Sequence, residues 1–161
     1  MARPSAARQA LVLLGVVATC LAVGGIGAAV TANSVAIWYP TLIKPSFNPP
    51  NGLFAPVWTA LYVMMAVAAW LVWRRDGWRG ARRALSLFAI QLALNCIWSL
   101  LFFGLRRADL ALIEIVLLLA TIVATALAFR QHSPPAALLL VPYLAWVSFA
   151  TVLNTAIWRL N

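Results

Sequence analysis

The residues of this chain best suited to chemistry are amides and aromatic side chains that lie within apolar runs. Gln91, Asn95, Trp98 and Phe102 are spaced at i, i+4, i+7 and i+11, so on a helix they share one face. Two similar stripes are formed by Tyr143, Trp146, Ala150 and Asn154, and by Trp58, Tyr62, Met65 and Ala69. An amide or indole N–H is costly in an apolar environment unless it finds a partner. The three stripes are therefore predicted to face one another or a shared cavity.

Two interpretations of the stripes remain open at this level. In the simpler one, Gln91, Asn95 and Asn154 hydrogen-bond across packed helices and bind no ligand. In the other, the stripes line a pocket, and the mid-segment positions of Trp98 and Trp146 favour it, because residues of an interfacial aromatic belt lie at segment ends. Such a pocket suits a large, flat, mostly apolar ligand with a few polar groups.

Other kinds of chemistry have little support. The sequence shows no Ser/His/Asp set, no paired carboxylates, no metal-ligand cluster and no glycine-rich phosphate loop, so we expect neither hydrolysis nor a metal site. Glu114 is the only carboxylate well inside an apolar run. A midplane Glu would suggest proton-coupled export, but Glu114 is near the end of its segment, so an ion pair with Arg106 or Arg107, or snorkelling, is expected.

The elements that must hold these residues are membrane-spanning helices. The chain has 161 residues, of which 65% are hydrophobic and 9% charged, and its mean hydropathy is +0.94; a soluble domain carries about 25% charged residues. A span needs roughly 20 apolar residues. We therefore predict an all-α integral membrane protein, one domain over residues 1–161, with five transmembrane helices. They cover approximately residues 9–32, 56–73, 84–105, 109–129 and 136–158.

The basic residues predict the orientation. The net charge is +9, but the arginines lie between apolar runs, which argues against nucleic-acid binding and for contact with anionic headgroups. One side collects Arg3, Arg8, Arg74, Arg75, Arg79, Arg82, Arg83 and Arg130, and the other has Lys44, Arg106, Arg107 and Arg159. This bias predicts a cytoplasmic N-terminus. The first segment has an alternative interpretation as a signal peptide, with Val30, Thr31 and Ala32 as a cleavage site.

The connection over residues 33–55 is unusual for a linker. It contains four of the nine prolines, which predicts a stiff, non-helical segment, and it carries Trp38, Tyr39, Phe47 and Phe54. A plain linker would be polar and flexible. We favour a lid over the mouth of the bundle, and the alternative is an aromatic contact with headgroups.

Four motifs follow one another along the chain: W-Y-P-x-L-x-K-P-x-F-x-P-P at 38–50, P-x-W-x-x-L-Y at 56–62, Q-L-x-L-N-x-x-W-S-x-x-F-F-G at 91–104 and P-Y-L-A-W-x-x-F-A-T-x-L-N at 142–154. In this order they resemble the motifs of the translocator protein / tryptophan-rich sensory protein (TspO/MBR) family. The resemblance runs from Trp38 to the C-terminus. It implies a five-helix bundle with the first loop folded over a ligand cavity, and a first helix that is retained rather than cleaved.

The resemblance also implies a set of ligand-binding residues. They are Tyr39, Phe47, Asn48, Trp58, Tyr62, Asn95, Trp98, Tyr143, Trp146, Phe149 and Ala150. Family members bind porphyrins and synthetic ligands, and some bind sterols. Sterol binding is doubtful here, because Thr155 stands where the sterol motif has Tyr, before Arg159. Homologues dimerise through the third helix, where Ala89 and Ala93 give compatible small-residue spacing.

The expected function follows from the cavity and the resemblance together. We expect a membrane protein that binds porphyrins and similar flat hydrophobic molecules, as sensor, regulator or transporter, with Asn95 and polar groups of the loop orienting the ligand's carboxylates. It needs no cofactor, and a bacterial membrane is its expected location. An enzymatic alternative is light-dependent porphyrin breakdown, in which Trp58 and Trp146 would be the reactive residues.

Overall fold

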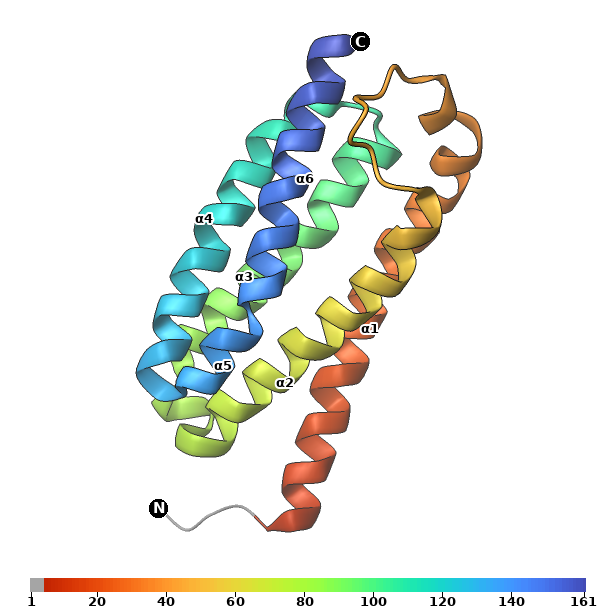
Figure 1. Cartoon of the computed structure of the whole chain (residues 1–161). Helices are drawn as coiled ribbons and strands as arrows, with labels where there is room; N and C mark the ends of the chain where they lie inside the picture. Colours follow the sequence, from red (N-terminus) through yellow and green to blue (C-terminus); the bar gives the residue numbers. More distant parts are fainter. Residues whose placement is uncertain (1–4) are drawn as a thin grey trace.

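The computed structural model describes residues 5–161, and these residues form helices joined by short connections (Figure 1). The elements are α1 (Ala6–Ile37), η1 (Tyr39–Thr41), η2 (Asn51–Leu53), α2 (Phe54–Gly80), α3 (Arg82–Ser99), η3 (Leu100–Gly104), α4 (Ala108–His132), α5 (Pro134–Leu139) and α6 (Val141–Leu160). Five helical segments within this range are long and apolar enough to cross a membrane. The prediction of an all-helical protein with five spans is confirmed. Arg3, which was counted for the orientation, lies outside the described residues.

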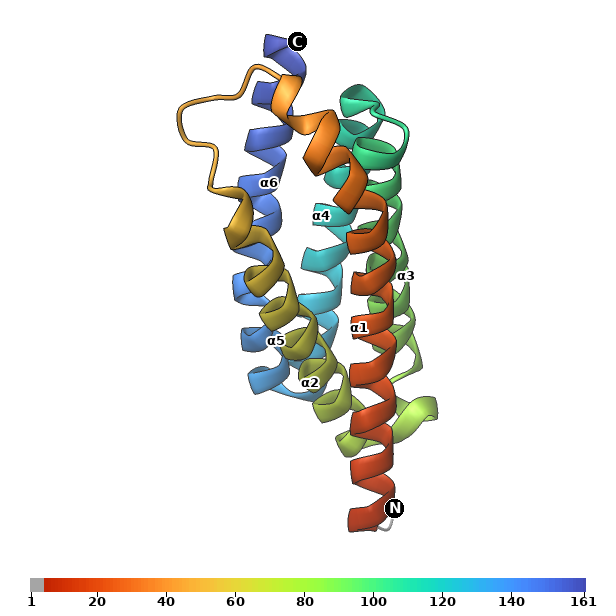
Figure 2. The same ribbon diagram turned by 90° about the vertical axis from the view of Figure 1, so that its right-hand side faces the viewer.

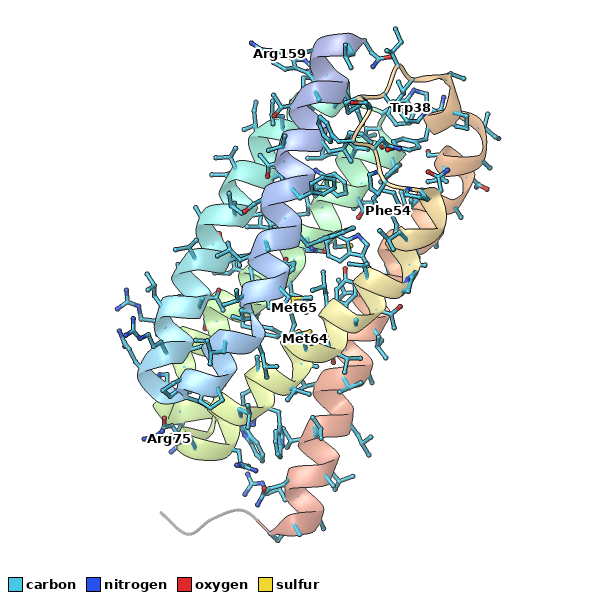
Figure 3. All side chains as sticks on the ribbon, in the orientation of Figure 1. Trp38, Phe54, Met64, Met65, Arg75 and Arg159 are labelled. Carbon is cyan, nitrogen blue, oxygen red and sulfur yellow. The ribbon has the colours of Figure 1, made fainter. Side chains whose placement is uncertain are left out.

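The five spans form a bundle in which successive helices run in opposite directions (Figures 1 and 2). α1 packs on α2 and α3, α4 packs on α3, α5 and α6, and α2 packs on α5 more than on α6. Trp38 and Arg159 lie at one end of the bundle, here called the loop end, and Arg75 lies at the opposite end (Figure 3). α2 leans away from α6 toward the loop end (Figure 1).

The spans are longer than the apolar segments that predicted them. Residues 74–83 were expected to form a loop, but α2 continues to Gly80 and breaks only at Gly77, whose φ is +68°. Glycine adopts this left-handed conformation at little cost. His132 Nδ1 lies 2.6 Å from Asp76 Oδ2, joining the ends of α2 and α4. Hydropathy falls at the arginines, yet helical hydrogen bonds do not require apolar side chains, so a hydropathy boundary underestimates the helix.

Two of the spans contain an irregular turn. The fifth span bends where α5 meets α6, and Pro142 lies just after the bend, where its missing N–H removes a helical hydrogen bond. At the end of α3, η3 is a π-helical turn in which the N–H of Leu105 donates to the carbonyl of Leu100 at 2.8 Å. The hydroxyl of Ser34 on α1 donates to the carbonyl of Phe103, which fastens α1 to this turn. π-helical turns are rare and occur often at functional sites.

Candidate ligand-binding cavity

A cavity of about 510 Å³ lies between α1, α2, α3 and α6 toward the loop end. This volume is within the range of about 300–1,000 Å³ that is usual for small-molecule sites. Its walls are mostly apolar, and Tyr39 contributes to it from the connection after α1. Small exposed residues line it between α1 and α2, among them Ala28, Ala32 and Ala55. The cavity is therefore partly open on the side where these two helices diverge from one another (Figure 2).

Aromatic rings form the walls of this cavity. The ring centroids of Trp58 and Tyr62 on α2 are 5.7 Å apart, and those of Trp146 and Phe149 on α6 are 5.8 Å apart. Phe54, at the start of α2 beside the loop (Figure 3), meets Trp146 edge to face at 6.1 Å. These are the separations at which aromatic pairs attract each other, so the rings hold one another in place.

Asn95 connects two tyrosines beneath these rings. Its Oδ1 accepts a hydrogen bond from the hydroxyl of Tyr62 at 2.6 Å, and its Nδ2 donates to the hydroxyl of Tyr143 at 3.0 Å. All three side chains are buried. The network joins α2, α3 and α6, because each residue comes from a different helix. Asn95 was expected to orient a ligand's carboxylates, but its oxygen and one of its N–H groups are already used within the protein.

Asn154 has the same role nearer the loop end. Its Oδ1 accepts from the indole N–H of Trp98 at 3.2 Å, and its Nδ2 donates to the carbonyl of Ala108 at 2.8 Å. The ring of Trp98 stacks on Phe102 at 5.3 Å, with the two planes 19° apart. Gln91, deeper in the bundle, donates to Met65 Sδ at 3.8 Å and does not line the cavity. Cross-helix bonding by the three amides is thus present together with a cavity.

The connection between α1 and α2 is held by its own side chains and by Asn161. The hydroxyl of Tyr39 donates to Asn48 Oδ1 at 2.6 Å, and the ammonium of Lys44 lies 5.0 Å from the centre of the Tyr39 ring. Burial raises the pKa of Tyr39 above its ordinary value of 10.0, and the bond to Asn48 offsets part of this effect. Asn161, after α6, accepts from the N–H of Ile43 at 2.9 Å and donates to its carbonyl at 3.0 Å.

The structure brings together most of the predicted site residues. Those that line the cavity are Tyr39, Trp58, Tyr62, Asn95, Trp98, Trp146, Phe149 and Ala150. Three others do not. Tyr143 is fully buried behind Asn95, Asn48 holds Tyr39 from outside, and Phe47 is 47% exposed, with its ring 6.3 Å from that of Phe149.

One wall of the cavity was missed by the sequence reasoning. α1 supplies Leu21, Gly24, Gly25, Gly27, Ala28, Thr31, Ala32 and Val35. Glycines spaced in this way on a membrane helix are typical of close helix packing, which by itself indicates no cavity. Gly24 does pack closely, because a Cβ there would lie 2.6 Å from a ring carbon of Tyr62, whereas a Cβ at Gly25 would meet nothing within 4 Å. Only that difference, which the sequence does not show, separates a packing glycine from one that leaves space.

The expectation for Glu114 was wrong. Arg107 pairs instead with Asp109, its Nε 2.8 Å from Oδ1 and its terminal nitrogen 2.6 Å from Oδ2. Glu114 is 7% exposed, and neither of its carboxyl oxygens has a hydrogen-bond partner in the described structure. It faces the bundle interior rather than the headgroups, and it is not among the residues that line the cavity.

Comparison with known proteins identifies the family to which this chain belongs. Residues 16–159 match the model of the TspO/MBR family. A tryptophan-rich protein TspO from Chlorobaculum tepidum is 49% identical over 156 residues, which cover 96% of this chain and 98% of that protein. The translocator protein of Homo sapiens is 44% identical over 126 residues, covering 77% of this chain and 75% of its own length. The tryptophan-rich sensory protein of Cereibacter sphaeroides is 41% identical over 124 residues, with 77% of each chain covered. The chain therefore belongs to the TspO/MBR family of membrane proteins.

Proposed function

We propose that this protein binds porphyrins and similar flat, mostly apolar molecules in the cavity between α1, α2, α3 and α6, as a sensor, regulator or transporter. The observation that carries the proposal is the set of three indoles, Trp58, Trp98 and Trp146, around one apolar space of about 510 Å³. Burial of a planar ring against indole faces supplies both hydrophobic and aromatic attraction. The names of the relatives, translocator and sensory protein, agree with a role in transport or sensing.

The test is porphyrin titration of a double variant. Trp58→Phe combined with Trp146→Phe removes indole area from two walls and keeps aromatic rings there, so we expect porphyrin binding to weaken at least tenfold. Binding is followed by the porphyrin's own Soret absorbance, because the substitutions themselves remove tryptophan signal. Trp78→Phe is the matched control, since Trp78 is exposed at the opposite end of the bundle. Equal affinity of the double variant and the control would exclude the cavity as the binding site.

Light-dependent porphyrin breakdown is a second candidate. Trp58 lies in a chain of aromatic contacts, 5.7 Å from Tyr62 and 6.3 Å from Tyr143 by ring centroids, through which an oxidised indole could be reduced. Illumination of the porphyrin complex in air should then bleach the Soret band, and Trp58→Phe should slow the bleaching. Bleaching at the rate of free porphyrin would leave binding as the function.

The same proposal includes a homodimer in a bacterial membrane, with the N-terminus in the cytoplasm. Ala89, Ile90, Ala93 and Ile97 are exposed along α3, which gives a face of small and branched side chains for a second copy. In a background without Cys20 and Cys96, Ala93→Cys should form a disulfide-linked dimer in native membranes. A cysteine at lipid-facing Ile113 of α4, 65% exposed, is the control that should remain monomeric.

A further inference from the structure

The carboxyl group of Glu114 has no role in the cavity described above. Its side chain is 7% exposed, neither of its oxygens has a hydrogen-bond partner among residues 5–161, and it does not line the cavity. A buried carboxyl group without partners is costly to the fold. Ionisable side chains that face the interior of a membrane bundle are rare, and they commonly mark the pathways of protons, ions or substrates. The position of Glu114 therefore indicates a functional group.

The surroundings of Glu114 contain one polar neighbour and no counter-ion. α4, which carries Glu114, packs on α2, α3, η3, α5 and α6. From α6, the hydroxyl of Tyr143 lies within electrostatic range of the Glu114 carboxyl. α2 and α3 contribute Tyr62 and Cys96, neither of which bonds to Glu114, and α5 and η3 contribute no titratable side chain. The charged side chains of these helices lie toward the two ends of the bundle, and none in residues 5–161 pairs with Glu114.

Tyr143 connects this carboxyl to the wall of the cavity. Its oxygen accepts from Asn95 Nδ2 at 3.0 Å, and Asn95 Oδ1 accepts from the hydroxyl of Tyr62 at 2.6 Å. Asn95 and Tyr62 line the cavity, and Tyr143 lies behind them. The hydroxyl hydrogen of Tyr143 has no acceptor in the described part of the chain, so it can turn toward a negative charge on Glu114. A change of charge on Glu114 therefore acts on the hydrogen bonds that hold the wall.

We propose that Glu114 is a proton-binding site coupled to the occupancy of the cavity, so that a ligand binds together with a proton and leaves as the proton leaves. The proton comes from solvent and joins a carboxylate oxygen of Glu114. An apolar ligand excludes water from the cavity and lowers the local dielectric constant, which disfavours a charge behind the wall. Because coupling between two sites is reciprocal, the proton strengthens ligand binding by the same factor. The inference goes beyond the proposed function, on which it rests only for the choice of porphyrin as the probe.

The test follows the carboxyl group itself by infrared spectroscopy of the full chain in lipid nanodiscs. A protonated carboxyl has a C=O stretch that the carboxylate lacks. Glu114 is the only glutamate of the chain, so labelling with ¹³C-glutamate moves its band away from those of Asp76, Asp109 and the porphyrin without any substitution. Across about pH 5–9, we expect the band to be lost as the pH rises. With saturating protoporphyrin IX, we expect it to persist to a proton concentration about tenfold lower.

The outcomes separate the inference from the proposed function. A band that is absent or unchanged across the whole pH range overturns the inference, because Glu114 would then be a fixed ion or a fixed neutral acid. A band that titrates in the same way with and without bound porphyrin also overturns it and leaves the proposed function standing. Soret absorbance of the same samples measures binding. A chain that binds no porphyrin overturns the proposed function and the coupling together.

Tyr143→Phe tests the route between the two sites. It removes the hydroxyl group and leaves the lining of the cavity in place, because Tyr143 does not line it. We expect the effect of porphyrin on the Glu114 band to fall by at least half. Ser148→Ala is the matched control, since the Ser148 hydroxyl on the same helix donates only to the carbonyl of Leu144, at 2.8 Å. An equal effect of porphyrin in the two variants overturns the coupling through Tyr143.

Discussion

Gly24 offers a direct test of how α1 and α2 meet at the cavity. A Cβ at this position would lie 2.6 and 2.7 Å from two ring carbons of Tyr62 and 3.2 Å from a third. Ordinary contact begins at about 3.4 Å, so the ring or the helix must move by roughly 0.8 Å. The ring cannot turn away freely, because its hydroxyl is bonded to Asn95 and its face lies beside Trp58.

Gly24→Ala should therefore destabilise the protein, and Gly25→Ala is the matched control. Both substitutions gain the same helix propensity, about 1 kcal/mol, but a Cβ at Gly25 meets nothing within 4 Å. Overpacking costs about 2 kcal/mol, which for a chain of this size corresponds to about 4–8 °C in melting temperature. We expect Gly24→Ala to melt lower than Gly25→Ala by that amount in detergent, and to bind porphyrin more weakly. Equal melting temperatures would refute the close approach of α1 to Tyr62.

Three further substitutions test polar groups elsewhere. Asn161→Ala removes both bonds to Ile43, so hydrogen exchange at the Ile43 amide should accelerate by roughly tenfold, as expected for about 1.4 kcal/mol. The melting temperature should stay constant. Unchanged exchange would show that Asn161 does not hold the loop. Gln91→Leu removes a buried amide whose Oε1 has no partner and which donates only to Met65 Sδ, so stability should stay level or rise by about 1 kcal/mol; a fall in melting temperature would reveal a partner for that oxygen. Glu114→Leu removes two buried, unpartnered carboxyl oxygens and should raise stability by about 1–3 kcal/mol, measured as a rise in melting temperature. A lower melting temperature would mean that the carboxyl has hydrogen-bond partners in the native protein.

The sequence predicted the walls built by α2, α3 and α6 because helical spacing determines which residues share a face. Trp58, Trp98 and Trp146 were expected to face a common space, and all three line the cavity. The same spacing was misleading for Tyr143, which shares the stripe of Trp146 but is fully buried behind Asn95 and does not line the cavity. A helical face is about 100° wide, so residues on one stripe can line a cavity or lie in the packing beside it.

The contribution of α1 could not be predicted in this way. A glycine has no side chain that could indicate a cavity. The same small-residue spacing lets Gly24 approach Tyr62 closely and leaves open space at Gly25. The π-helical turn at η3 could not be predicted from the sequence either, and it changes which side chains face the cavity. By inserting a residue into the helical register, it places both Phe102 and Phe103 on the cavity, where the sequence stripe predicted Phe102 alone.

Hydrogen bonding across packed helices and a pocket between them, the two interpretations that the sequence left open, are compatible in this wall. The indole of Trp98 is held at its N–H by Asn154, which in turn is held by the carbonyl of Ala108 on α4. A bond at the edge of the ring satisfies its polar atom and leaves its face apolar. The same is true of Tyr62, whose hydroxyl is bound by Asn95 while its ring lines the cavity. Asn95 and Asn154 thus turn polar aromatic residues into rigid apolar walls, and the shape of the cavity depends on hydrogen bonds between the side chains that build it.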